Sequence, residues 1–260
     1  PRVQPGSPQD KDIEEIARIL KDSNRPLLYI GDGVWRSGAE TEIARLANHF
    51  GIPIAGTPRY VSIRYRPGFC GRLTEALPTI CPDTIICVGV RHGGQGTSRD
   101  LDTFTQAKSV IVIGADSDSS RNIHGIDLTV LADERQTVQR LNQLALTKYP
   151  ADNFAERRSW AHQQAAKFRD EQISIAQKVK AQTSTIRPWK VVETLDSELE
   201  HLGGGLVMME QFALPLEGIV GSPENRNNIY IWPAGGSEGY GIGATLGLKL
   251  AAPDRPVVGV

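Results

Sequence analysis

The amino-acid sequence predicts an α/β protein: a doubly wound parallel sheet, followed by a second, incomplete α/β domain. Three observations predict this class. Short apolar runs alternate with amphipathic helical patterns through residues 1–146, as in chains built from βαβ units. The runs at 84–90 and 109–114 are almost wholly apolar, as expected for parallel strands that helices cover on both faces. The alternation resumes at Pro188 and stops inside an apolar run at 256–260, so we expect the natural chain to continue.

In residues 1–146, signals for helix starts and ends alternate with strand-like apolar runs. Ser7 and Pro8 predict a helix start, and Ser37 with Glu40 predicts a second start as a capping box. Gly51 is predicted as a helix C-cap, and Asp133 with Gln136 caps a last helix. The helical stripes span 13–20, 43–50 and 138–144, and the strand runs fall at 26–30, 51–55, 84–90, 109–114 and 127–131.

Residues 151–182 carry no strand signal and divide the chain. Phe154, Ala161, Phe168 and Ile175 recur every seven residues, which predicts one helix with a narrow apolar seam. We interpret it as a helical linker packed along the first domain, with a coiled-coil partner helix as the alternative. The predicted domains are therefore 1–150, a linker at 151–187, and 188–260.

The second half repeats the α/β pattern. A helix is predicted from Pro188, with strands at 206–209 and 229–232, a helix at 239–252 and the start of a strand at 256–260. The segment 234–244 is rich in glycine and lies between a strand and a helix. Glycine lets backbone approach a ligand closely, and a helix N-terminus can receive a phosphate. A tight turn with small residues for helix–sheet packing predicts the same pattern.

Composition excludes several classes of function. The net charge is −1 and no apolar run reaches membrane-spanning length, so we expect neither a nucleic-acid partner nor a membrane partner. Cys70, Cys81 and Cys87 are too few and too scattered for a disulfide framework or a zinc site, and Cys87 is expected in the core. We expect a cytoplasmic protein, with a mitochondrial location left open.

Several segments, taken together in their order, resemble the thiamine-diphosphate-dependent enzymes of the acetolactate synthase and benzoylformate decarboxylase superfamily. Residues 25–33 (RPLLYIGDG), 51–54 (GIPI), 83–91 (DTIICVGVR) and 113–116 (IGAD) resemble the family's nucleotide-binding-like middle domain. The stretch 235–260 resembles the start of its diphosphate-binding domain. The resemblance implies thiamine diphosphate and Mg²⁺ as cofactors. It places the metal ligands beyond Val260 and the catalytic glutamate in another domain, so no catalytic or metal-binding residue is assigned to this chain.

The resemblance also implies which residues contact the cofactor. They are the strand-end residues Glu210, Gln211 and Phe212 and the glycine-loop residues Gly236, Ser237 and Glu238. The Gly236 carbonyl would accept a hydrogen bond from the cofactor's 4′-amino group, and position 238 would lie beneath the bent cofactor. Glu238 departs from the apolar residue that the family has there, and a carboxylate under the ring is costly to desolvate. Phe212 departs too, because its side chain cannot donate to a diphosphate.

The first domain offers a second place for a ligand. Gly31, Asp32 and Gly33 form a turn after a strand, and Arg91, His92 and Asp116 follow other strand ends, where ligands of open α/β sheets bind. The family's flavin-binding members carry Phe-Asp-Asp after the arginine, whereas residues 92–95 read His-Gly-Gly-Gln here. We therefore expect no FAD, and a colourless full-length protein.

The resemblance implies part of a 2-oxo-acid decarboxylase or carboligase that works through a thiazolium enamine, as a homodimer or homotetramer. We expect this chain alone to be inactive. The alternative is a non-catalytic α/β module, derived from that family, that binds a nucleotide or a partner.

Overall fold

The computed structural model describes residues 5–56, 68–90, 104, 106–117, 125–181, 186, 188–210, 227–231 and 239–260. The chain divides into two compact units, which are described separately. The first comprises Pro1–Thr57 and Pro67–Ala166, and the second comprises Pro58–Arg66 and Lys167–Val260. No described helix is both long enough and apolar enough to cross a membrane.

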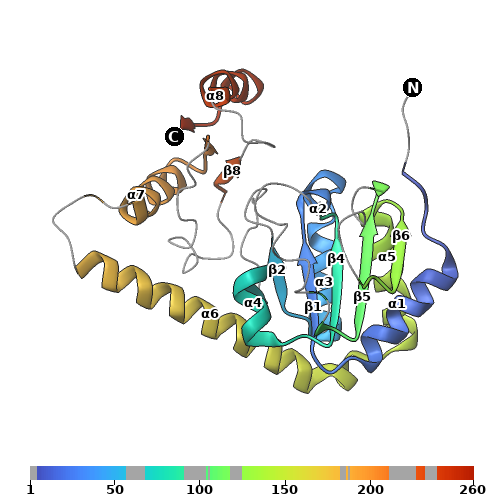
Figure 1. The fold of residues 1–260 in the computed structure, drawn as a ribbon. Helices are drawn as coiled ribbons and strands as arrows, with labels where there is room; N and C mark the ends of the chain where they lie inside the picture. Colours follow the sequence, from blue (N-terminus) through green and yellow to red (C-terminus); the bar gives the residue numbers. More distant parts are fainter. Residues whose placement is uncertain are drawn as a thin grey trace. The chain divides into compact units, whose positions relative to one another are not determined.

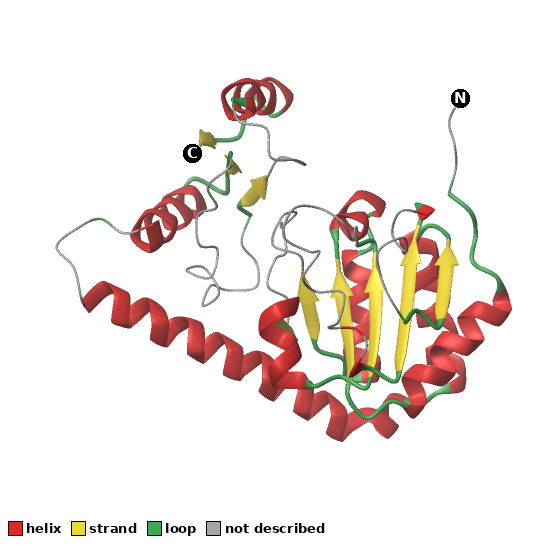
Figure 2. Ribbon diagram, viewed as in Figure 1, coloured by secondary structure: helices red, strands yellow, loops and turns green. Residues whose placement is uncertain are grey.

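The first unit is built on a six-stranded sheet whose paired strands all run parallel (Figures 1 and 2). Its order is β3-β2-β1-β4-β5-β6, so the chain winds outward in one direction from β1 and in the other from β4. This confirms the predicted doubly wound fold. The strands are β1 (Pro26–Ile30), β2 (Ile54–Gly56), β3 (Phe69–Arg72), β4 (Thr84–Val88), β5 (Ser109–Gly114) and β6 (Leu128–Leu131).

Helices cover both faces of this sheet (Figure 2). They are α1 (Asp10–Asp22), α2 (Asp32–Ser37), α3 (Glu40–Phe50), α4 (Leu73–Ile80), α5 (Glu134–Lys148) and α6 (Ala155–Ala181), with the short 3-10 helix η3 (Ala151–Phe154) before α6. Leu27 and Cys87 belong to the core on one face, together with Ala76 of α4 and Ala165 of α6. On the other side, α1 and α3 both contact α5, and α5 contacts β5.

The ends of these helices confirm some sequence predictions and correct others. Gly51 ends α3 in the left-handed region at φ 65°, and the Asp133 side chain accepts the Gln136 N–H at 2.8 Å, as predicted. The Ser7–Pro8 start is wrong, because α1 begins at Asp10 without a side-chain cap. The Ser37 capping box is also wrong. Ser37 ends α2, and its hydroxyl donates to the Gly33 carbonyl at 2.8 Å.

Helix α6 confirms the long helix predicted near 154–180. Phe154, Ala161 and Phe168 of the seven-residue pattern are buried, whereas Ile175 is exposed. The division between the two compact units falls inside this helix, after Ala166. The predicted linker at 151–187 is therefore not a separate compact unit, and the assignment of 1–150 and 188–260 to family domains stays a prediction.

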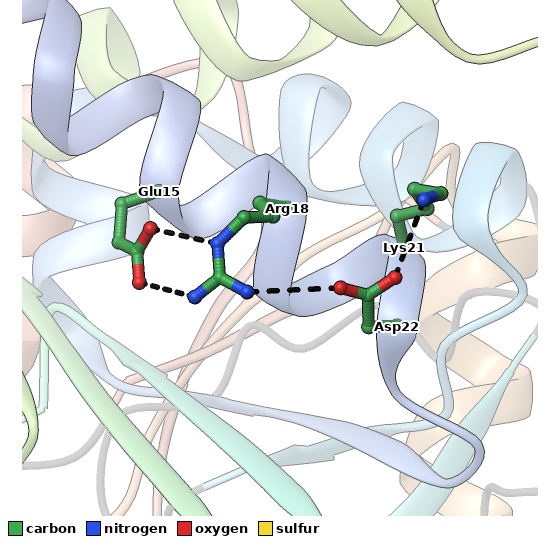
Figure 3. Close-up of polar contacts among 4 residues, drawn as sticks. All are labelled: Glu15, Arg18, Lys21 and Asp22. Carbon is green, nitrogen blue, oxygen red and sulfur yellow. Dashed lines mark hydrogen bonds and ion pairs between the residues drawn. The ribbon is translucent and has the colours of Figure 1, made fainter.

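The surface of α1 carries a chain of ion pairs (Figure 3). Arg18 donates to both carboxylate oxygens of Glu15, at 2.9 and 2.6 Å, and lies 3.7 Å from Asp22. Lys21 lies 3.4 Å from the same Asp22 carboxylate. These side chains are exposed, so the ion pairs contribute little to the free energy of unfolding.

The second unit contains a three-stranded parallel sheet in the order β8-β7-β9. Val258 packs with Val192 of α7 in one core, while a Cβ on the next residue, Gly259, would lie 2.5 Å from Thr245 of α8. Since side chains alternate between the faces of a strand, α7 and α8 cover opposite faces. The elements are α7 (Pro188–His201), β7 (Leu206–Met208), β8 (Ile229–Ile231), α8 (Tyr240–Ala251) and β9 (Val257–Gly259).

A buried polar cluster ties α7 to this sheet. The Asn228 side chain accepts the Gly205 N–H at 2.9 Å and donates to Asp196 Oδ1 at 2.9 Å. The Tyr230 hydroxyl donates to the same Asp196 oxygen at 2.9 Å. Buried polar groups are tolerated when they are hydrogen-bonded in this way, so the cluster fixes the helix relative to the strands.

Candidate functional site

The carboxyl edge of the first sheet is closed where the strand order reverses. The turn after β1 packs on the turn after β4, and the Gly33 N–H donates to the Gly89 carbonyl at 2.9 Å. A Cβ on Gly31 would lie 2.4 Å from the Gly89 oxygen, and one on Gly33 would lie 2.6 Å from Gly89 Cα. The close approach therefore requires these glycines, and the Gly33 N–H in the first turn of α2 is already used.

Two buried carboxyl groups lie beside this turn. Asp32 is 4% exposed and forms an ion pair with Arg36 at 3.2 Å. Glu134, which is 6% exposed, accepts the Ala115 N–H at 3.1 Å. Its Oε1 would lie 2.7 Å from a Cβ on Gly33. Burial raises the pKa of Glu134, and the nearby Asp133 and Asp32 carboxylates raise it further.

The described part of this edge offers little to an anionic ligand. Its described groups include two carboxyls and the Gly89 carbonyl, with Arg36 engaged by Asp32. Asp116 is exposed after β5, while Arg91 and His92 lie outside the described residues. The expectation that no flavin binds here stays a prediction. Sequence reasoning missed Glu134, because an acid after an N-cap residue is common in helices whose first turn is exposed.

Glu210 is the predicted cofactor residue that the structure describes. It follows β7, and its carboxylate Oε1 accepts the backbone N–H of Gly239, the N-cap residue of α8. Its own backbone N–H donates to the Val260 carbonyl at 3.1 Å, at the end of β9. Gln211, Phe212, Gly236, Ser237 and Glu238 lie outside the described residues. The predicted segments are 210–212 and 236–238. Glu210 begins the first, and Gly239 directly follows the second, so the Glu210–Gly239 hydrogen bond brings the two segments together.

The described end of this site consists of the Gly239 backbone and the Glu210 side chain. Gly239 adopts φ 84°, and a Cβ there would have no neighbour within 4 Å, so bare backbone faces open space. Among the described residues, the Glu210 carboxylate is the polar side chain bonded to Gly239, and its negative charge repels phosphate. No group of three or more metal-ligating side chains occurs in the described part of the chain. The described residues therefore do not complete a diphosphate site by themselves, and cofactor binding at this place stays a prediction.

The cysteines take no part in either place. All three are free thiols, as predicted. Burial raises the pKa of Cys70 to about 12 and also raises that of Cys87, which lies in the core as expected. Because the thiolate is the nucleophile, neither thiol is activated for covalent catalysis.

Comparison with known proteins connects this geometry to a family. Residues 13–141 match the thiamine pyrophosphate enzyme central domain. The acetolactate synthase large subunit of Corynebacterium glutamicum is 25% identical over 264 residues, which cover 96% of this chain and 40% of that protein. The isozyme 3 large subunit of acetolactate synthase from Escherichia coli is 23% identical, over 95% of this chain and 43% of that protein.

Solved structures share the fold. The thiamine diphosphate-dependent 4-hydroxybenzoylformate decarboxylase of Rhodococcus jostii superimposes with a TM-score of 0.67 at 17% identity, over 98% of this chain and 46% of that one. The chain thus spans less than half the length of each relative compared. Through its central domain at residues 13–141, this chain belongs to the family of thiamine-pyrophosphate-dependent enzymes.

Proposed function

We propose that this chain supplies the central domain and the first part of the diphosphate-binding domain of a thiamine-diphosphate-dependent enzyme. Its reaction would break or form a carbon–carbon bond of a 2-oxo acid, as a decarboxylase or a carboligase. One observation carries the proposal. The central-domain match at 13–141 lies within a similarity to acetolactate synthase that extends over 96% of the chain.

In this proposal the chemistry is divided between the cofactor and the protein. Bound thiamine diphosphate supplies a thiazolium carbon that stabilises the negative charge left on the substrate when its bond breaks. The residues of this chain hold and orient the cofactor's ring. The Gly236 carbonyl would accept from the 4′-amino group, Ser237 would belong to the same loop, and the strand-end residues Glu210, Gln211 and Phe212 would lie at the diphosphate. Glu238 lies beneath the ring, where its carboxylate needs a partner or a proton.

Other parts of the proposal concern groups beyond these residues. Mg²⁺ would bind the diphosphate through ligands beyond Val260, and the full enzyme would act as a homodimer or homotetramer. The alternative is a non-catalytic module that binds a nucleotide or a partner. The described residues of the first sheet argue against the nucleotide only. There the Gly33 N–H is taken by Gly89 and two carboxyl groups lie alongside.

Calorimetric titration tests the proposal. The chain of residues 1–260 and the product of the full coding region are each titrated with thiamine diphosphate and Mg²⁺. We expect the chain to bind with a Kd above about 1 mM, since it lacks the metal-bridged diphosphate contacts, and the full product to bind with a Kd of about 1 μM, or about −8 kcal/mol.

Two outcomes would contradict it. Micromolar binding by the 260-residue chain would mean that its own residues complete the site. Absence of binding by the full product would favour the non-catalytic alternative.

A further inference from the structure

Glu210 lies where three segments of the second unit meet. Its side chain bonds the N-cap residue of α8, and its backbone N–H bonds Val260 at 3.1 Å, at the end of β9. Its second carboxylate oxygen faces the first turn of α8, where a Cβ on Gly241 would lie only 2.7 Å from Oε2. One residue therefore links the ends of β7 and β9 to the start of α8.

Helix α8 has no N-terminal cap from a side chain of its own segment. Its N-cap residue is Gly239, which has no side chain, and its first turn contains no acidic residue. The first N–H groups of a helix need acceptors, and the helix dipole favours a negative charge beside them. The Glu210 carboxylate meets both needs from another element of the unit.

We propose that Glu210 is a positioning residue that caps α8 with its own carboxylate and so fixes the exit of the glycine-rich segment at Gly239. The role rests on the proposed function, in which residues 236–238 contact the thiamine ring. In addition, the Glu210 carboxylate of the chain itself occupies the Gly239 N–H at the N-terminus of α8. A ligand's phosphate does not bind the Gly239 N–H, and the diphosphate must find other donors.

The cap also requires a glycine at position 241. Because the Glu210 carboxylate lies against its Cα, a methyl group there would displace the cap. The cap therefore depends on a strand-end acid and on a glycine in the first turn of the following helix.

Amide exchange on the ¹⁵N-labelled chain tests the cap without any cofactor. The Glu210→Ala variant should lose about tenfold or more of the protection of the Gly239 amide, the loss that a hydrogen bond to a charged group predicts. Glu210→Gln keeps an acceptor oxygen and should stay within about threefold of the wild type. Glu198→Gln, an exposed acid of α7, is the matched control and should leave this amide unchanged. Protection at Val207 reports that each variant remains folded.

A titration with inorganic pyrophosphate gives the second readout. The Gly239 amide resonance should move in Glu210→Ala, whose helix end is vacated, and should stay in place in the wild type. Unchanged exchange at Gly239 in Glu210→Ala, or a pyrophosphate-dependent shift of this amide in the wild type, would overturn the proposal. Both readouts are independent of the thiamine diphosphate calorimetry, so failure of the cap and failure of the proposed function are distinguishable.

Discussion

At the scale of single residues, Glu134 holds a carboxyl group where charge is costly. It is buried, it accepts one N–H from Ala115, and it lies near the Asp32 and Asp133 carboxylates. Burial, with these neighbours, raises its pKa in the folded protein above the ordinary value of 4.5. The stability that the protonated form provides is present below that value and is lost as the pH rises through the folded-state pKa.

Replacement of Glu134 by glutamine should therefore stabilise the protein at high pH. The glutamine side chain would keep an oxygen for the Ala115 N–H but cannot ionise. We expect Glu134→Gln to raise the free energy of unfolding at pH 8 by on the order of 1 kcal/mol and to change it less at pH 4. Urea unfolding at the two pH values measures this, with the exposed acid Glu171 changed to glutamine as control. Equal effects at both pH values would refute the assignment of a raised pKa.

Sequence reasoning succeeded at single residues where the signal is local. Asp133 and Gly51 are cap residues whose bonding partners lie within four residues, so spacing alone identifies them. Ser37 failed because its hydroxyl bonds back to Gly33 inside a short helix, a competing local bond. Glu134 gave no signal, since its burial depends on a turn about 100 positions earlier in the sequence.

At the scale of elements, Arg157 joins three helices of the first unit. From the start of α6 its guanidinium donates to the Leu20 carbonyl at 2.9 Å, and to the carbonyls of Ser23 and Phe50. These carbonyls end α1 and α3, where a cation also complements the helix dipole. The guanidinium lies 4.7 Å from the Phe154 ring centroid. Burial lowers the pKa of Arg157 to about 10, so it stays charged at neutral pH.

Loss of this guanidinium should loosen both helix ends together. We expect Arg157→Met, which keeps an apolar stem, to lower the free energy of unfolding by about 2–4 kcal/mol, because several buried carbonyls lose a charged donor. The neighbouring Arg158→Met is the control. Arg158 donates to the carbonyls of His49 and Ala151 at 3.2 and 2.7 Å, and its loss should cost about 1 kcal/mol or less. Urea unfolding compares them, and equal losses would show that Arg157 has no special role.

The elements that sequence reasoning missed are those with mixed signals. Strand β3 is four residues long and contains Gly71, and α4 contains Pro78. Glycine weakens a strand and proline removes a helical hydrogen bond, so neither stretch shows a clean period. Tertiary contacts hold them instead, because Cys70, Leu73 and Ala76 are all in the main core. Long or strongly apolar elements such as α6, β4 and β5 were predicted nearly to their ends.

At the scale of the whole molecule, the described residues of each compact unit include a hydrophobic core of their own. One core contains residues of the first unit, from Leu27 to Ala165. The other contains residues of the second unit, from Val192 to Tyr230. The sequence predicted two α/β regions because the strand–helix alternation stops and restarts, and the family resemblance covered both. The sequence could not place the boundary between the units inside α6. The helical pattern is continuous there, and it does not show where the helix stops contacting one unit and begins to belong to the other.

Because each compact unit has its own core, we expect two cooperative unfolding transitions, which a matched pair of substitutions can separate. Val112 of β5 and Val207 of β7 are both fully buried, and each lies on a strand that pairs on both sides. Truncation of either to alanine should cost about 2 kcal/mol through lost apolar burial and the cavity left behind. In differential scanning calorimetry, Val112→Ala should lower one transition by several degrees and leave the other in place, and Val207→Ala should do the reverse. A joint shift of a single transition by both variants would mean that the two cores unfold as one cooperative unit.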